Sequence, residues 1–200
     1  RYHLETYGPD FQYPQFAKIY KEQCRQWEPE AWADLFERAG ARYAVLVTKH
    51  HDGFLYWPSR HPNPLMPDYH TDRDIVGELS QSLARRGIKM GCYYSSALDW
   101  TFTSRPIRTV GELFTTGPTS QLYRDYIEAH WLELIERYDP WILWNDIGYP
   151  PGYNLAKLFA HYYNQKSEGV VNDRWLQIPG FFYNPIGRTL LNYLARRSLQ

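Results

Sequence analysis

The residues that could do chemistry in this chain stand directly after four short apolar runs. Each run is typical of a buried β-strand, and the polar groups that follow are Lys49-His50-His51-Asp52, Tyr93-Tyr94-Ser95, Trp144-Asn145-Asp146 and Asn172-Asp173-Arg174. Any one of these residues alone could be structural, as a satisfied histidine, a cap or a surface ion pair. Parallel strands of a barrel, however, carry their carboxyl ends to one mouth. The pattern therefore predicts a functional site at that mouth.

The residue types narrow the chemistry of this predicted site. A metal centre needs three or more converging His, Asp or Cys ligands, and neighbours such as His50 and His51 on a strand point to opposite faces. Arg174 at the same mouth would repel a dication. A nucleophilic serine would need a strained elbow such as G-x-S-x-G, which the sequence lacks. The carboxylate of Asp146 remains, and retaining glycosidases use such a carboxylate to attack a sugar carbon.

The composition predicts a soluble globular protein of ordinary domain size. The chain has 200 residues, of which 44% are hydrophobic and 22% charged, and its formal net charge is zero. A neutral chain has no basic field to attract nucleic acid or an anionic membrane, so neither partner is expected. Its high aromatic content, 18%, suits either sugar-stacking surfaces or the packing of helices on strands. Of its two cysteines, Cys92 lies in an apolar run and is expected to be buried.

Helices and strands alternate along the chain. Apolar spacing and capping residues predict four helices, over residues 28–39, 72–86 (capped by Thr71), 120–138 (capped by Ser120) and 154–165. Apolar runs predict four strands, at residues 43–47, 88–94, 141–144 and 169–171. This alternation indicates an α/β fold of parallel strands joined by crossover helices.

Two α/β architectures compete, the open doubly wound sheet and the (β/α)8 TIM barrel. An open nucleotide-binding sheet usually has a Gly-rich turn after its first strand, whereas this chain has Thr48-Lys49-His50-His51 there. The long loops after the first two strands also favour a barrel with function at its mouth. Four βα units are half of such a barrel, so we expect an incomplete (β/α)8-like barrel.

The last part of the chain departs from this pattern. No acidic residue follows Asp173, and residues 176–200 show no continued βα alternation. This segment could form a short helix over residues 190–197, but an abnormal terminus, from truncation or an altered reading frame, is the preferred interpretation. We therefore divide the chain into a partial catalytic barrel, residues 1–175, and an atypical tail, residues 176–200.

Several segments of the chain form recognisable motifs. They are F-x-Y-P-x-F from Phe11, W-E-P-E-A-W-A-D-L-F from Trp27, A-G-A-R-Y-A-V-L-V-T-K-H-H-D-G-F-L-Y-W-P-S from Ala39, R-D-I-V-G-E-L from Arg73, G-C-Y-Y-S-S-A-L-D-W from Gly91, Y-D-P-W-I-L-W-N-D-I-G from Tyr138 and V-N-D-R-W from Val171. With these motifs the chain resembles glycoside hydrolase family 29, the α-L-fucosidases, and bacterial members in particular. The similarity spans about residues 8–175, and K-H-H-D-G-F and L-W-N-D are its most specific motifs.

The resemblance implies a retaining fucosidase with a barrel and a C-terminal β-sandwich, and with neither a metal nor an organic cofactor. Asp146 matches the nucleophile that forms a covalent fucosyl-enzyme. The substrate-binding residues implied in the same way are His50, His51, Tyr93 (with Tyr94 the weaker candidate), Trp144 and Arg174. The implied substrate is a fucosylated oligosaccharide or glycoside. A homo-oligomer is possible for this family, and the compartment is open between bacterial cytoplasm, periplasm and secretion.

The resemblance also implies parts that the chain does not contain. Family members begin the barrel upstream of residue 1 and carry an acid/base glutamate shortly after the position of Arg174, but no glutamate follows Glu168. General acid catalysis typically contributes about 10²–10⁴-fold in rate. We therefore expect this chain alone to hydrolyse fucosides poorly or not at all. The alternatives are a non-catalytic, fucose-binding degenerate barrel and, with less support, a metal-dependent barrel hydrolase built on His50, His51 and Asp146.

Overall fold

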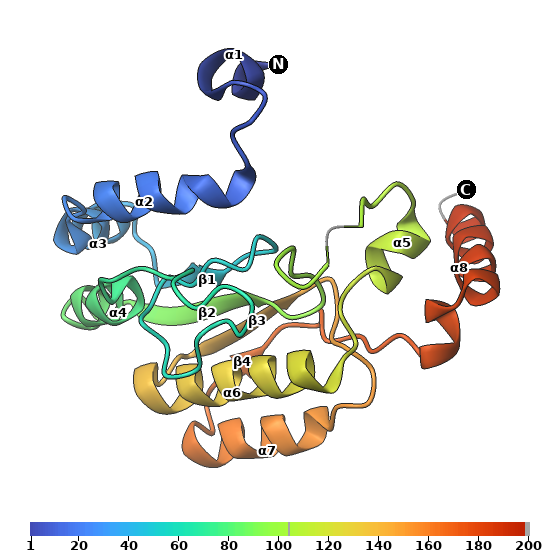
Figure 1. Ribbon diagram of the computed structural model, residues 1–200. Helices are drawn as coiled ribbons and strands as arrows, with labels where there is room; N and C mark the ends of the chain where they lie inside the picture. Colours follow the sequence, from blue (N-terminus) through green and yellow to red (C-terminus); the bar gives the residue numbers. More distant parts are fainter. Residues whose placement is uncertain (104, 199–200) are drawn as a thin grey trace.

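A four-stranded parallel sheet organises the chain (Figure 1), as seen in a computed structural model that describes residues 1–103 and 105–198. The strand order is β1-β2-β3-β4, which is also the order along the sequence. Their bounds are β1 Tyr43–Lys49, β2 Lys89–Ser95, β3 Ile142–Asp146 and β4 Val170–Val171. All three neighbouring pairs are parallel. The predicted α/β fold with four successive parallel strands is confirmed.

Helices join the strands and cover one face of the sheet. Helix α3 (Pro29–Arg38) precedes β1, and the crossovers are α4 (Ile75–Ala84), α6 (Gln121–Tyr138) and α7 (Leu155–Gln165). Figure 1 shows α6 and α7 side by side beneath the sheet. Each predicted helix and strand is therefore present, with bounds shifted by a few residues.

The two faces of the sheet have different surroundings because side chains alternate along each strand. On β2, Cys92 and Tyr94 are fully buried in a core that includes Leu83 of α4 and Trp131 of α6. Burial raises the pKa of the Cys92 thiol to about 12, so this cysteine is an inert core residue, as predicted. Tyr93, between these two, projects from the opposite face, which becomes the inner face of the half-barrel.

The helix caps agree with the prediction at one helix and differ at another. Ser120 caps α6 by accepting a hydrogen bond from the backbone N–H of Tyr123. Helix α4 begins later than predicted because its cap is Asp74, whose side chain accepts from Gly77 at 2.9 Å. The predicted cap, Thr71, instead donates its backbone N–H to Leu55 at 2.9 Å. A local strand-like bridge therefore delays the start of this helix.

The remaining elements lie outside the predicted alternation of strands and crossover helices. They are α1 (Tyr2–Tyr7), η1 (Tyr13–Gln15), α2 (Phe16–Cys24), α5 (Val110–Thr115), η2 (Gly180–Tyr183) and α8 (Pro185–Ser198). Helix α1 stands away from the sheet in Figure 1, and α8 packs beside α5. Helix α8 contains the short helix considered for residues 190–197 and begins earlier, at Pro185.

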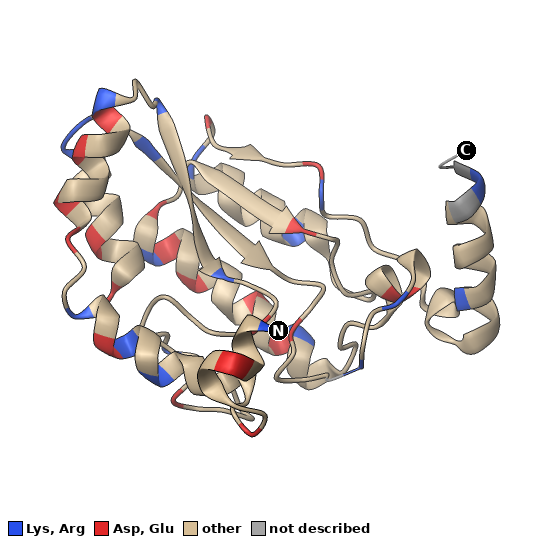
Figure 2. Ribbon diagram, turned by 90° about the horizontal axis from the view of Figure 1, so that it is seen from above, with Lys and Arg blue, Asp and Glu red and all other residues tan. Residues whose placement is uncertain are grey.

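Charged residues of both signs are interspersed over the helices around the sheet. Figure 2 shows acidic and basic positions mixed on these helices and only basic positions on α8. No helix within the described residues is long and apolar enough to cross a membrane. The acidic and basic residues, whose charges cancel in the sequence, are thus mixed over the helices around the sheet.

Candidate active site

Asp146 ends β3, and its carboxylate accepts three hydrogen bonds. Tyr93 donates its hydroxyl to Oδ2 at 2.7 Å, while Arg174 Nη1 and the backbone N–H of Ile147 donate to Oδ1, each at 3.0 Å. The Asp146 side chain is 17% exposed, so it is sheltered yet reachable. Every partner is a donor, which fixes the plane of the carboxylate and leaves it as an acceptor.

The backbone directly after Asp146 is strained. Ile147 has φ 67, in the left-handed region that a β-branched residue rarely adopts. The same residue donates its N–H to the carboxylate of Asp146, so the strained position is in direct contact with the candidate nucleophile. Strain of this kind persists where surrounding structure enforces it, and it is concentrated at functional sites.

Arg174 reaches Asp146 because two asparagines tie its segment to β3. The backbone N–H of Asn145 donates to Asn172 Oδ1 at 3.1 Å, and Asn172 Nδ2 donates back to the carbonyl of Asn145 at 2.9 Å. Asn145 Nδ2 also donates to the carbonyl of Arg174 at 2.8 Å. The Arg174 side chain itself is 59% exposed. Its position is therefore determined by the contacts of its backbone and of the neighbouring Asn172 with β3.

Tyr93, and not Tyr94, faces Asp146. Burial, and then the hydrogen bond to Asp146, raise the pKa of Tyr93, so its hydroxyl stays a donor at neutral pH. Tyr94 is fully buried on the opposite face of the sheet, where its hydroxyl lies 2.8 Å from Nδ1 of His130. The alternation along β2 thus separates the two neighbouring tyrosines as expected.

His50 and His51 follow β1 and lie beside this pair. The ring of His50 stacks on Tyr93 with centroids 5.7 Å apart and an interplanar angle of 15°. The two histidine rings are 4.0 Å apart. The expectation that they point to opposite faces is wrong, because β1 ends at Lys49 and the histidines belong to the turn after it.

The hydrogen bonds of His51 determine its tautomer. Its Nδ1 lies 2.7 Å from Ser95 Oγ, and Ser95 uses its one hydroxyl proton to donate to the carbonyl of Leu98. Ser95 must therefore accept from Nδ1–H, which leaves Nε2 as a free acceptor. Burial, and then the neighbouring His50, lower the pKa of His51 to about 4, so the ring is neutral at neutral pH. A neutral ring with a free acceptor suits a sugar hydroxyl.

A buried ion pair beside these histidines joins the end of β1 to the loop after β2. Lys49 and Asp99 have fully buried side chains, with Nζ 3.0 Å from Oδ2. Lys49 Nζ also donates to the carbonyl of Ser95 at 2.8 Å, and Thr101 Oγ1 donates to the other Asp99 oxygen at 2.5 Å. The end of β1 is therefore joined both to the end of β2, where Ser95 contacts His51, and to the loop after β2, which carries Asp99.

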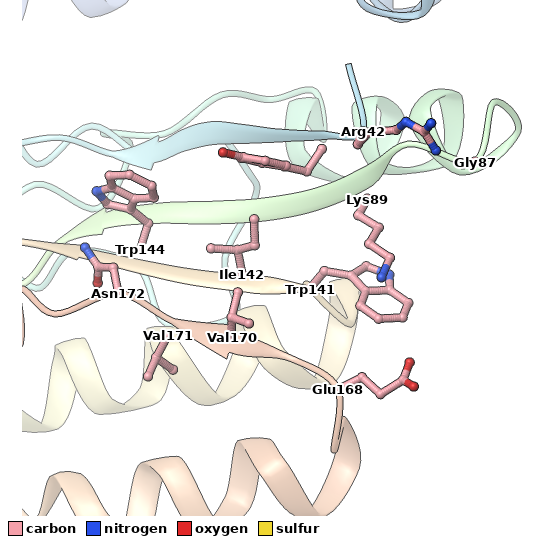
Figure 3. A pocket seen from close by; sticks show the side chains of 11 residues that line it. Arg42, Gly87, Lys89, Trp141, Ile142, Trp144, Glu168, Val170, Val171 and Asn172 are labelled. Atoms are coloured by element: carbon pink, nitrogen blue, oxygen red, sulfur yellow. The ribbon is translucent and has the colours of Figure 1, made fainter. Parts of the chain in front are cut away.

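Trp144 lies on the inner face of the sheet, two residues before Asp146. It is paired in register with Tyr93 and lines a cavity of about 620 Å³ (Figure 3). The cavity runs back to Lys89 and Trp141 at the amino ends of the strands. In a complete barrel, side chains of all the strands fill this volume. The cavity is therefore core that four strands leave open, and the candidate site is the polar cluster at its carboxyl end.

The structure brings most of the predicted site residues together. Direct contacts join Asp146 to Tyr93 and Arg174, Tyr93 to His50, and His50 to His51. Trp144 lies on the same face of β3 as Asp146, two residues before it, and lines the cavity. Glu168, the last glutamate of the sequence, precedes β4 and lines the cavity at the opposite, amino end of the strands. Glu168 therefore lies at the end of the sheet away from Asp146.

Three contributors were not predicted from the sequence: Ser95 as the partner of His51, Asn145 as the support of Arg174, and Asp99 as the counter-ion of Lys49. Their signal, a polar residue within or just after an apolar run, was visible only for Ser95 and Asn145. Within residues 1–103 and 105–198, no three His, Cys, Asp or Glu residues are grouped to hold a metal ion. The alternative built on His50, His51 and Asp146 as metal ligands gains no support.

Comparisons with a family model, with related sequences and with solved structures all find proteins described as fucosidases. The family model described as Alpha-L-fucosidase matches residues 1–195. The tissue alpha-L-fucosidase of Bos taurus is 38% identical over 184 residues, covering 86% of this chain. The Thermotoga maritima alpha-fucosidase, solved in complex with fucose, is 42% identical with a TM-score of 0.81 over 89% of this chain. Its complex with a mechanism based inhibitor gives a TM-score of 0.80 over 87%.

The match covers only part of these relatives. The chain spans 37% of the Bos taurus protein and 42% of the Thermotoga maritima chain. The family match extends to residue 195 and so passes the proposed boundary at residue 175. The division into barrel and tail stays a prediction.

Proposed function

Because the chain belongs to the alpha-L-fucosidase family, we propose that it carries the nucleophilic part of a retaining glycosidase that removes terminal α-L-fucose from glycoconjugates. One observation carries this proposal: the Asp146 carboxylate is held by Tyr93 and Arg174 beside two histidines. Its substrate is a fucosylated oligosaccharide or glycoside.

In the proposed reaction, an oxygen of Asp146 attacks the anomeric carbon of fucose. The bond from that carbon to the aglycone oxygen breaks, and the aglycone leaves with the bonding electron pair. Water then cleaves the fucosyl ester, which restores the carboxylate and the original anomeric configuration. Tyr93 and Arg174 keep the carboxylate in one plane for the attack, so less reorganisation is needed at the transition state.

The remaining residues are proposed to bind the sugar. His51 offers a neutral acceptor at Nε2 to a fucose hydroxyl, and the exposed His50 offers a second polar ring beside it. The partly buried indole of Trp144 lies on the same sheet face as Asp146 and is suited to an apolar C–H face of the sugar. Arg174 supplies further donors from the exposed side.

The lack of a glutamate after Glu168 limits the leaving groups that this chain can release. Without a proton donor, the aglycone must leave as an anion, so only activated aryl fucosides should react. We expect a rapid release of about one equivalent of dinitrophenolate from dinitrophenyl α-L-fucoside, measured by stopped-flow absorbance, and little reaction with methyl α-L-fucoside. Asp146→Asn should abolish the release.

A second candidate is a non-catalytic fucose-binding protein, favoured by the same missing glutamate. A binder would hold methyl α-L-fucoside in a titration yet release no dinitrophenolate, in the original chain or in the Asp146→Asn variant. The two outcomes are exclusive, so the stopped-flow measurement decides between them.

A further inference from the structure

Trp100 lies on the rim of the candidate site and is held there by its backbone. Its N–H donates to the carbonyl of His51 at 2.7 Å, and its ring centroid is 6.5 Å from that of His51. A series of contacts thus leads outward from the nucleophile, through Tyr93, His50 and His51, to Trp100.

Tyr13, from the N-terminal segment, stands against Trp100. Their ring centroids are 5.2 Å apart and the rings are nearly perpendicular, at 81°. Tyr13 contacts Phe16, which belongs to an aromatic cluster with Tyr7 and Phe11. The cluster packs this segment on itself around Phe16, so the two rim rings come from separate parts of the chain.

Both rings remain accessible. Trp100 is 47% exposed and Tyr13 is 49% exposed, whereas Trp57 and Trp131 of the core are completely buried. Exposure alone does not distinguish Trp100, since Trp32 on α3 is 45% exposed. The position of Trp100 does, because its backbone N–H is bonded to His51 and its ring stands against Tyr13, so two accessible rings lie together beside the polar site residues.

The location and the chemistry of these rings select the ligand. An aromatic face carries partial negative charge, so it attracts the weakly positive C–H groups on the apolar face of a pyranose ring. We propose that Trp100 and Tyr13 form a shelf that binds the neutral sugar to which fucose is attached. This inference rests on the proposed function, because the attached sugar extends from the anomeric carbon at Asp146 towards the rim.

The test compares ligands with and without the second sugar. The probes are methyl α-L-fucoside and α-L-fucosyl-(1→2)-D-galactose, titrated by NMR into the chain and its variants. We expect the disaccharide to bind more tightly than the monosaccharide. Trp100→Ala should weaken the disaccharide by about twofold to tenfold, the loss for one aromatic contact of ~0.5–1.5 kcal/mol, and should leave the monosaccharide unchanged. Trp100→Phe should retain most of the difference.

A matched control is Trp32→Ala, because Trp32 is 45% exposed but lies on α3, outside the shelf. This variant should bind both ligands like the original chain. Equal disaccharide affinity in the original chain and in Trp100→Ala, with the fold of both verified by their amide spectra, would overturn the shelf.

Methyl β-D-galactoside separates failure of the shelf from failure of the proposed function. A shift of the Trp100 indole N–H resonance with this probe, absent in Trp100→Ala, supports the shelf even where fucosides do not bind. Fucoside binding without any response of Trp100 to either galactose-containing probe supports the function and contradicts the shelf. Absence of all binding contradicts both.

Discussion

The carboxylate of Asp146 depends on individual hydrogen bonds, and the tyrosine bond is the one most open to a clean test. Tyr93→Phe removes a single hydroxyl that donates to Oδ2 at 2.7 Å. Without this bond the carboxylate can turn out of the plane from which it attacks, so we expect dinitrophenolate release to slow by about 10- to 100-fold. Stopped-flow absorbance gives the rate directly.

The control for this substitution is the neighbouring tyrosine. Tyr94→Phe removes a hydroxyl on the opposite face, 2.8 Å from His130, and should lower the free energy of unfolding while leaving the release rate nearly unchanged. Equal slowing of release by both substitutions would mean that Tyr93 acts through stability and not through Asp146.

The lowered pKa of His51 predicts that the free energy of unfolding depends on pH. Its pKa is lowered to about 4 by burial, from an ordinary value of 6.5. Between these two pH values the unfolded chain binds more protons than the folded chain, so the free energy of unfolding falls as pH falls from about 6.5 to 4. Above about pH 6.5 the contribution is constant. Urea unfolding at a series of pH values measures this slope.

The fully buried His130 contributes to the same slope, because burial lowers its pKa to about 3. The variant His51→Gln should therefore reduce the slope between pH 6.5 and 4 without removing it. An unchanged slope in His51→Gln would contradict the neutral, buried state of His51.

Among the elements, the junction between β1 and the loop after β2 depends on the Lys49–Asp99 pair. Both side chains are fully buried with their charges 3.0 Å apart. Lys49→Met leaves the Asp99 carboxylate buried and uncompensated, which should cost ~3–5 kcal/mol of unfolding free energy. Urea unfolding measures the loss.

The double variant Lys49→Met with Asp99→Asn is the control for that loss. It removes both charges and should recover a substantial part of the stability. Losses that add without any recovery would show that the two groups act independently and do not form the junction.

The sequence predicted elements well where local pattern and tertiary structure agree. The apolar runs at Tyr43 and Ile88 form β1 and β2 close to the predicted bounds, and Ser120 caps α6 through a purely local bond. The start of α4 was missed because Thr71 pairs its backbone with Leu55, a contact that no local pattern reveals. Short elements such as α1 and η1 depend on aromatic contacts made only in the folded chain.

The candidate site was predictable to a similar degree. Residues at strand ends, such as Asp146 and Tyr93, follow from the parallel topology once the strands are located. The stacked arrangement of His50 and His51 was not predictable, since it depends on β1 ending at Lys49. Asp99 escaped notice because its counter-ion is distant in the sequence.

For the whole molecule, the structure indicates that the C-terminal helix is peripheral to the sheet. Helix α8 packs on α5, where Arg188 Nε donates to Thr115 Oγ1 at 2.9 Å and Asn192 accepts from Gly111 at 2.7 Å. Residues before it are tied to the barrel, since the carbonyl of Leu176 accepts from the Tyr149 N–H at 2.8 Å. Deletion of residues 179–200 should therefore leave the cooperative unfolding of the sheet intact.

Near-ultraviolet circular dichroism, which reports the packing of buried tryptophans such as Trp131, measures that outcome during thermal unfolding. Deletion from residue 176 is the comparison, because it also removes Leu176 and Gln177, whose side chain donates to the carbonyls of Pro150 and Tyr153. The longer deletion should destabilise the sheet more. Loss of cooperative unfolding in the shorter deletion would instead make α8 part of the core.

The central claim, that Asp146 is a nucleophile able to form a covalent bond to fucose, is tested most directly by trapping. An activated 2-deoxy-2-fluoro-fucosyl fluoride is incubated with the chain, and the product is analysed by intact and peptide mass spectrometry. We predict one 2-deoxy-2-fluoro-fucosyl group per chain, attached to Asp146 with release of the anomeric fluoride, and no label in Asp146→Asn. A chain that stays unlabelled, or a label on another residue that persists in Asp146→Asn, would contradict the account.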